Sequence, residues 1–144
     1  MIVVSDTSAL FAAFDRSQAE HGPSLRVMET ETLLISPLVL TELDRLVHRD
    51  LGFDAAMQVT DALMRRLLDG RYKLEELKPV DLDAAQTVRA KYEGLRLDLA
   101  DAVGVALADK YRTNSIFTLD QRDFRAIEPL TPGMNAFRIL PADL

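Results

Sequence analysis

Short apolar runs that stop abruptly at polar residues constrain this chain more than any other feature. Residues 1–4 (MIVV), 33–35 (LLI) and 115–119 (SIFTL) are too short and too rich in bulky side chains for helices. Such runs are typical of strands that are buried on both faces of a sheet. Between them, apolar side chains recur at helical spacing, as in 54–69 and 99–111. This alternation predicts a mostly parallel sheet covered by helices on both faces.

The other segments fit the same pattern. Pro23 and Pro37 suit the first turns of helices, and Gly52 and Gly70 suit helix ends. With 144 residues and no repeat or linker, the chain is expected to form a single domain over residues 1–144. The remaining predicted helices span 8–16, 23–30, 38–51, 81–92 and 121–127, and the remaining predicted strands span 72–77 and 136–140.

The charge balance limits the possible ligands. Lysine and arginine number 17 against 23 aspartates and glutamates, which gives a formal net charge of −6. Affinity for nucleic acid comes mainly from basic side chains that replace counterions, so an acidic protein does not bind a polyanion by bulk attraction. A polyanionic substrate would therefore need a local basic rim or a bound cation.

The chain contains no cysteine, which excludes a disulfide framework, a thiolate metal site and a cysteine nucleophile. No apolar run approaches the roughly 20 residues that span a bilayer. The first residues lack a basic leader, and Asp6 interrupts what would be the apolar part of a signal peptide. We therefore expect a cytoplasmic protein that does not contact a membrane.

Four acids follow the predicted strands. Asp6 comes directly after the first strand and Asp120 directly after strand 115–119. Glu42 and Asp101 lie early in predicted helices. Ligands of parallel α/β sheets bind beyond the carboxyl ends of the strands. We therefore expect these four carboxylates to converge on one cleft.

Converging carboxylates need a partner. At a separation of about 6 Å and an effective dielectric constant near 20, each like-charged pair costs roughly 3 kcal/mol. The group would bind protons or stay apart unless a cation holds it together. Oxygen ligands without histidine or cysteine favour Mg²⁺ or Mn²⁺. Such an ion can activate a water molecule against a phosphodiester and supply the missing positive charge.

Three neighbouring residues allow more than one interpretation. Asp98 lies three residues before Asp101, where capping of the helix is favoured over metal ligation. Ser8 either caps its own helix or orients Asp6 and a metal-bound water, and both interpretations stay open. Asp123 is interpreted as a surface charge.

Four motifs, in chain order, resemble the PIN domain and in particular the VapC toxins of VapBC type II toxin–antitoxin pairs. They are SDTSAL at 5–10, LTEL at 40–43, LADA at 99–102 and TLDQRDF at 118–124. The resemblance implies a three-layer α/β/α fold with a central mostly parallel sheet, usually in a homodimer. It also implies an acidic quartet that binds Mg²⁺ or Mn²⁺, formed here by Asp6, Glu42, Asp101 and Asp120.

VapC toxins are typically endoribonucleases that cut structured RNA such as tRNA or rRNA, and a VapB antitoxin holds them inactive. For this chain, the resemblance implies hydrolysis of RNA by a metal-activated water. Candidate substrate contacts are Arg45 and Arg49, on the predicted helix that carries Glu42, and Arg122. Arg45 and Arg49 could instead pair with acids such as Glu42, and Arg122 could belong to a solvated charged face.

Other functions are consistent with parts of the pattern. A PIN-like nuclease outside toxin–antitoxin systems would need the same acids. A receiver-like signalling domain also carries carboxylates and Mg²⁺ at strand ends, but this chain lacks an adjacent acidic pair after the first strand and a lysine after the last buried one. A binding module without catalysis would leave the acidic quartet unexplained.

Overall fold

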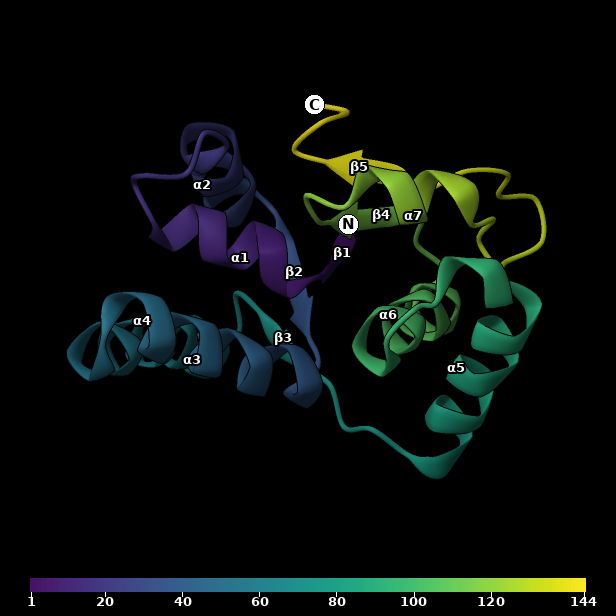
Figure 1. Ribbon diagram of the computed structural model, residues 1–144, viewed down its shortest axis with the longest axis horizontal. Coiled ribbons are helices and arrows are strands. Elements are labelled where there is room, and N and C mark those ends of the chain that lie inside the picture. The colour runs from purple at the N-terminus through teal and green to yellow at the C-terminus, as the bar shows by residue number, and fades with distance from the viewer.

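Five parallel strands form a single sheet in the computed structural model, which describes residues 1–144. The strand order is β3-β2-β1-β4-β5, so β1 is central (Figure 1). Val4 pairs with Leu34 on one side and with Ile116 on the other. The strands are β1 Ile2–Ser5, β2 Thr32–Ile35, β3 Lys73–Leu74, β4 Ser115–Phe117 and β5 Arg138–Leu140.

Helices cover both faces of the sheet (Figure 1). Helices α1 (Thr7–Phe14), α2 (His21–Thr30), α3 (Pro37–Leu51) and α4 (Phe53–Leu68) pack on one face. Helices α5 (Pro79–Lys91), α6 (Leu99–Lys110) and α7 (Gln121–Ala126) pack on the other, and a 3₁₀ turn, η1 (Glu93–Leu95), connects α5 with α6. This arrangement confirms the predicted three-layer α/β/α fold, with a sheet that is parallel throughout.

Alternation along the strands divides the core in two. Successive side chains of a strand point to opposite faces. Val3 accordingly packs among the residues of α1–α4, and its neighbour Val4 packs among those of α5–α7. Leu33 and Leu34 of β2 divide in the same way. The apolar runs lack polar residues because both faces of each strand are buried.

The main departure from the sequence-based expectation is the strand predicted over 72–77. Only Lys73 and Leu74 form ladder pairs with β2. Tyr72 is instead buried, and its hydroxyl donates to the Met28 carbonyl. The Glu75 amide still donates to Ile35, after which the chain leaves the sheet toward α5. Side-chain alternation overestimated the strand because the Tyr72 amide donates to the Arg66 carbonyl at the end of α4, and because the chain turns toward α5 after Glu75.

The other predicted helices and strands are present, with ends displaced by a few residues at most. None of the helices is both long and apolar enough to span a membrane. Because all strands run in the same direction, the segments that follow β1, β2 and β4 meet at one edge of the sheet. These are the segments in which the sequence places its conspicuous acids.

Candidate active site

Asp6 is fixed at the central position of this edge. It directly follows β1, and its amide donates to the Phe117 carbonyl over 2.8 Å. Its carboxylate Oδ2 accepts from the Thr118 hydroxyl at 2.7 Å and from the Ser8 hydroxyl at 2.9 Å. Two short hydrogen bonds to one oxygen leave the other oxygen, Oδ1, available for a ligand.

The same two hydroxyls hold the loop between β4 and α7. The Leu119 amide donates to Ser8 Oγ at 3.0 Å, and the Asp120 amide donates to Thr118 Oγ1 at 3.0 Å. Helix α1 has no side-chain cap, so Ser8 orients Asp6 and does not cap its helix. Sequence reasoning did not single out Thr118, because it placed this residue inside the strand predicted over 115–119, whereas β4 ends at Phe117.

Asp101 and Asp98 lie together at the start of α6. Asp98 Oδ1 accepts from the Asp101 amide at 2.8 Å, which confirms the predicted cap. This cap places Asp101 in the first turn, facing the end of β1. Asp98 itself is exposed and lines an adjacent cleft.

Asp120 and Asp123 form a similar pair at the start of α7. Asp120 Oδ1 accepts from the Asp123 amide at 3.0 Å. One carboxylate oxygen from each of Asp101, Asp120 and Asp123 lies within 4.8 Å of the others, and all three residues are half-buried. Asp123 is therefore part of the site and not the surface charge that the sequence suggested; its spacing of three residues from Asp120 was the available signal. We call Asp6, Asp101, Asp120 and Asp123 the acid cluster.

The acid cluster carries an uncompensated charge. Burial raises the pKa of Asp101 to about 9, and the nearby carboxylates of Asp6, Asp98 and Asp120 contribute to the rise. The pKa of Asp123 is raised by burial and by Asp120. No lysine or arginine forms an ion pair with any member of the cluster. These oxygen donors, without a basic partner, match the ligand preference of a hard divalent cation.

Glu42 faces the cluster from α3. Burial raises its pKa, with contributions from Asp98 and Asp6. Like Asp6, it is not one of the three residues whose carboxylate oxygens lie within 4.8 Å of one another, but unlike Asp6 it does not act on the pKa of Asp101. Glu42 and Asp98 instead line a cleft of about 500 Å³ between α3 and the start of α6. Of the four acids predicted to converge, Asp101 and Asp120 lie in the 4.8 Å group, Asp6 adjoins Asp101, and Glu42 lies at the rim.

The three predicted substrate arginines occupy different environments. Arg45 lines the cleft beside Glu42. Arg49, one turn farther along α3, donates to Asp50 at 2.8 Å and does not line the cleft. Arg122 is exposed at the start of α7, where its charge opposes the rise in the pKa of Asp123. Arg45 is the best placed of the three to meet a phosphate near the acids.

Several known proteins are similar to this chain in sequence or in fold. The PIN domain family model matches residues 3–129. Ribonuclease VapC26 of Mycobacterium tuberculosis is 36% identical over 141 residues, which cover 96% of this chain and 100% of that protein.

Two solved structures share the fold at lower identity. The M. tuberculosis toxin VapC20, described as cleaving the sarcin-ricin loop, matches with a TM-score of 0.73 and 22% identity over 85% of this chain and 92% of that one. VapBC2 of Rickettsia felis, bound to a promoter DNA fragment, matches with a TM-score of 0.70 and 18% identity over 96% and 98%. These findings exclude the receiver-like alternative. The chain therefore belongs to the PIN-domain family, among the VapC ribonucleases.

Proposed function

We propose that this protein is a divalent-cation-dependent endoribonuclease that acts as the toxin of a VapBC-type pair. The observation that carries the proposal is the acid cluster, in which Asp101 lies among other carboxylates and no lysine or arginine forms an ion pair with any of them. A cluster of this kind is costly to the fold unless a cation occupies it. The substrate class is structured RNA such as tRNA or rRNA.

The acid cluster would hold Mg²⁺ or Mn²⁺, with Glu42 facing it from the rim. When bound, such an ion supplies Lewis-acid activation of water and neutralises charge on the phosphodiester. Neighbouring side chains hold the acids of the cluster in place. Thr118 and Ser8 fix the Asp6 carboxylate, and the amide of Asp101 is held by Asp98.

Asp101 also couples cation binding to protonation. With a pKa of about 9, its carboxyl group keeps a proton at neutral pH when no cation is present. Carboxylate ligands bind metal in the deprotonated form, so occupation of the site releases this proton. Arg45 at the cleft is positioned to contact an RNA phosphate beside the acids. Arg49 and Arg122 are the weaker candidates for such contacts.

The partners follow from the family. A VapB-like antitoxin is the expected inhibitor, and the relatives from Rickettsia felis and Klebsiella pneumoniae were solved as toxin–antitoxin systems. A homodimer in the cytoplasm is the expected form of the free toxin. The relative VapC20 cleaves the sarcin-ricin loop, which supports structured RNA as the substrate class. The alternative function is that of a PIN nuclease without an antitoxin. The absence of a small antitoxin gene next to the gene for this protein would favour this alternative.

The proposal is tested by incubating purified, inhibitor-free protein with total cellular RNA and Mg²⁺ or Mn²⁺. We expect discrete fragments that disappear in EDTA and in the Asp101→Asn variant. Asp44→Asn, a matched substitution of an exposed acid on α3, should cleave like the wild-type protein. Cleavage that persists in EDTA, or that is lost equally in both variants, would contradict the proposal, as would a folded wild-type protein that cuts no RNA.

A further inference from the structure

A second hollow, of about 230 Å³, lies beside the acid cluster. Leu119 and Gln121, which precede and follow Asp120 in the chain, both line it. Thr118, whose hydroxyl holds Asp6, lines it as well. The start of α2 and the segment after β5 complete its wall. The hollow is therefore continuous with the residues that position the acids.

The lining of this hollow favours an uncharged ring over a phosphate. Its walls are largely apolar and include Pro23, Leu119 and Pro141. It has no lysine or arginine, and it includes the carboxylate residue Glu20. An anion would therefore be repelled. The volume lies below the roughly 300–1,000 Å³ of sites for drug-sized ligands, which suits one small planar group.

Gln121 lines the hollow, and the oxygen of its side-chain amide is held by Arg125. Its Oε1 accepts from Arg125 Nη2 at 3.1 Å and from Arg125 Nε at 3.3 Å. Because a guanidinium group only donates, the amide oxygen must face Arg125, and the Nε2 hydrogens face away from it. Neither of these hydrogens is used in an internal hydrogen bond.

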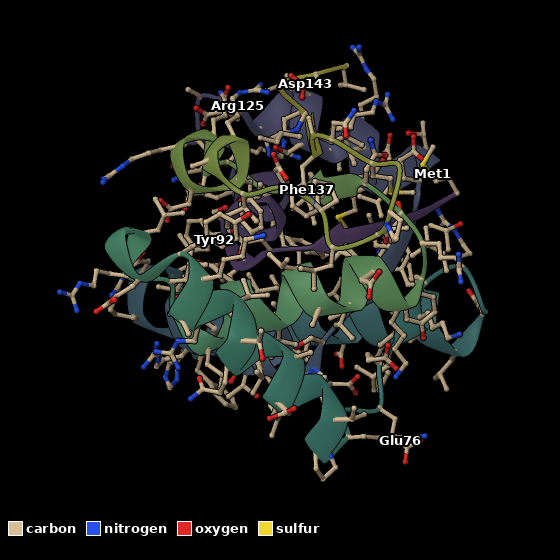
Figure 2. The ribbon with its side chains drawn as sticks, turned by 90° about the vertical axis from the view of Figure 1, so that its right-hand side faces the viewer. Met1, Glu76, Tyr92, Arg125, Phe137 and Asp143 are labelled. Carbon is tan, nitrogen blue, oxygen red and sulfur yellow. The ribbon has the colours of Figure 1, made fainter.

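Arg125 is itself held in place. Its Nη2 donates to Asp143 Oδ1 at 2.7 Å, and Asp143 Oδ2 accepts from the Ile139 amide at 2.8 Å. The two charged side chains lie at the same end of the molecule, where α7 meets the C-terminal segment (Figure 2). The orientation of Gln121 is thus set by a chain of contacts that reaches β5.

We propose that this hollow binds one unpaired nucleobase of the RNA, next to the phosphodiester at the acid cluster, with Gln121 Nε2 donating to the base. Proteins that read RNA sequence commonly bind unstacked bases and recognise the base edges by hydrogen bonds. Pro23, Leu119 and Pro141 supply the apolar contact, and Gln121 supplies the recognition. The inference rests on the proposed ribonuclease function and adds a specificity determinant to it.

The test uses an oligoribonucleotide that the wild-type protein cleaves, and a series of copies that each lack one base. We expect one abasic position beside the cleavage site to lower kcat/KM by roughly three- to tenfold, the effect of one neutral hydrogen bond. Gln121→Glu keeps the acceptor for Arg125 but removes the Nε2 donor, so a purely structural role would survive it. In this variant the kcat/KM penalty at that position should shrink to what the apolar contact alone contributes, while Gln58→Glu, on the exposed face of α4, should keep the full penalty.

A second readout does not depend on cleavage. In ¹⁵N-labelled Asp101→Asn protein, the side-chain amide signal of Gln121 should move on addition of the intact oligonucleotide and not of the abasic one. If the wild-type protein cleaves RNA but the penalty is as large in Gln121→Glu as in the wild type, the recognition by Gln121 is overturned and the nuclease stands. If no RNA is cleaved, the same titration uses a single-stranded oligoribonucleotide of mixed sequence: a Gln121 signal that moves supports the base site alone, and a signal that stays fixed overturns both proposals.

Discussion

Two groups of carboxylates are sheltered in this molecule, and they are compensated differently. Near the start of α5, the side chains of Glu75 and Asp81 are only 6% and 9% exposed. Lys110, at the end of α6, lies 3.7 Å from Glu75 Oε1 and 3.5 Å from Asp81 Oδ2. The chain thus provides its own cation for this pair, and the lysine connects the segment after β3 to α6.

The acid cluster contains more carboxylates and no such lysine. At the opposite end of α6, Asp101 is surrounded by Asp6, Asp98 and Asp120, and its pKa rises accordingly. A sheltered charge without a partner lowers stability, whereas a paired one costs much less. The difference indicates that the first group serves the fold and that the second is kept open for a cation from solution.

The largest expected effect comes from the same substitution made in both groups. Asp6→Asn should lower RNA cleavage roughly 10³-fold, because several kcal/mol of transition-state stabilisation depend on the cation that Asp6 helps to hold. Asp81→Asn should change the initial rate less than about twofold, because Asp81 lies far from the site. Initial rates on one RNA, with circular dichroism as the control for folding, provide the measurement. Equal losses of cleavage rate in Asp6→Asn and Asp81→Asn would contradict the distinction between the acid cluster and the carboxylates paired with Lys110.

A smaller loss is expected where a hydroxyl positions the cluster. Thr118→Val keeps the shape of a side chain that is 1% exposed but removes its hydrogen bond to Asp6. Loss of a group that orients a metal ligand typically lowers activity 10–100-fold. Thr113→Val is the matched control, because its buried hydroxyl donates to Ile2 away from the acids. A Thr118→Val protein with the wild-type kcat would contradict the role assigned to this hydroxyl.

A substitution at the ion pairs of Lys110 with Glu75 and Asp81 should change the stability of the protein and not its activity. Lys110→Met leaves Glu75 and Asp81 sheltered without their cation and should lower the Tm by roughly 3–6 °C. The additional change of Glu75 to Gln should recover part of this loss, because it removes one of the two uncompensated charges. Thermal unfolding of the single and double variants measures both effects. A single variant with an unchanged Tm would show that the lysine contributes nothing to the fold.

The acid cluster should show the opposite behaviour, because Asn at position 101 is neutral without taking up a proton, whereas Asp101 must bind one when the metal-free protein folds. The pKa of Asp101 rises from 3.8 to about 9 on folding. Between these values the folded chain keeps a proton that the unfolded chain has lost, so stability falls as the pH rises through this range. In EDTA at pH 8, Asp101→Asn should unfold about 2–8 °C above the wild-type protein, and the gap should close toward pH 4. A wild-type Tm at or above that of the variant at pH 8 would refute this assignment.

The sequence was sufficient for the fold because its signals are local. Each strand is an uninterrupted apolar run, and Pro37, Gly52 and Asp98 mark helix ends that the structure contains. The length of the strand predicted over 72–77 was the exception, because the burial of Tyr72 under α2 is a tertiary contact. Local patterns do not report such contacts.

The candidate site could be predicted only in part for the same reason. The positions of Asp6 and Asp120 directly after strands were sufficient to bring them to one edge. The participation of Asp123 and Thr118 depends on how the loop between β4 and α7 turns, which is set by hydrogen bonds to Ser8. The placement of Glu42 at the rim depends on the packing of α3, which the motif spacing does not specify.

Binding of Mn²⁺ to the metal-free protein, measured by calorimetry at pH 7.5 in two buffers of different ionisation enthalpy, separates the two groups of carboxylates. We predict that the wild-type protein and Asp81→Asn bind the ion with release of about one proton, which comes mainly from Asp101. Asp101→Asn should bind it at least about tenfold more weakly and without this release. A wild-type protein that binds no Mn²⁺, or an Asp101→Asn variant that binds it as the wild type does, would contradict the assignment of the acid cluster as the cation site.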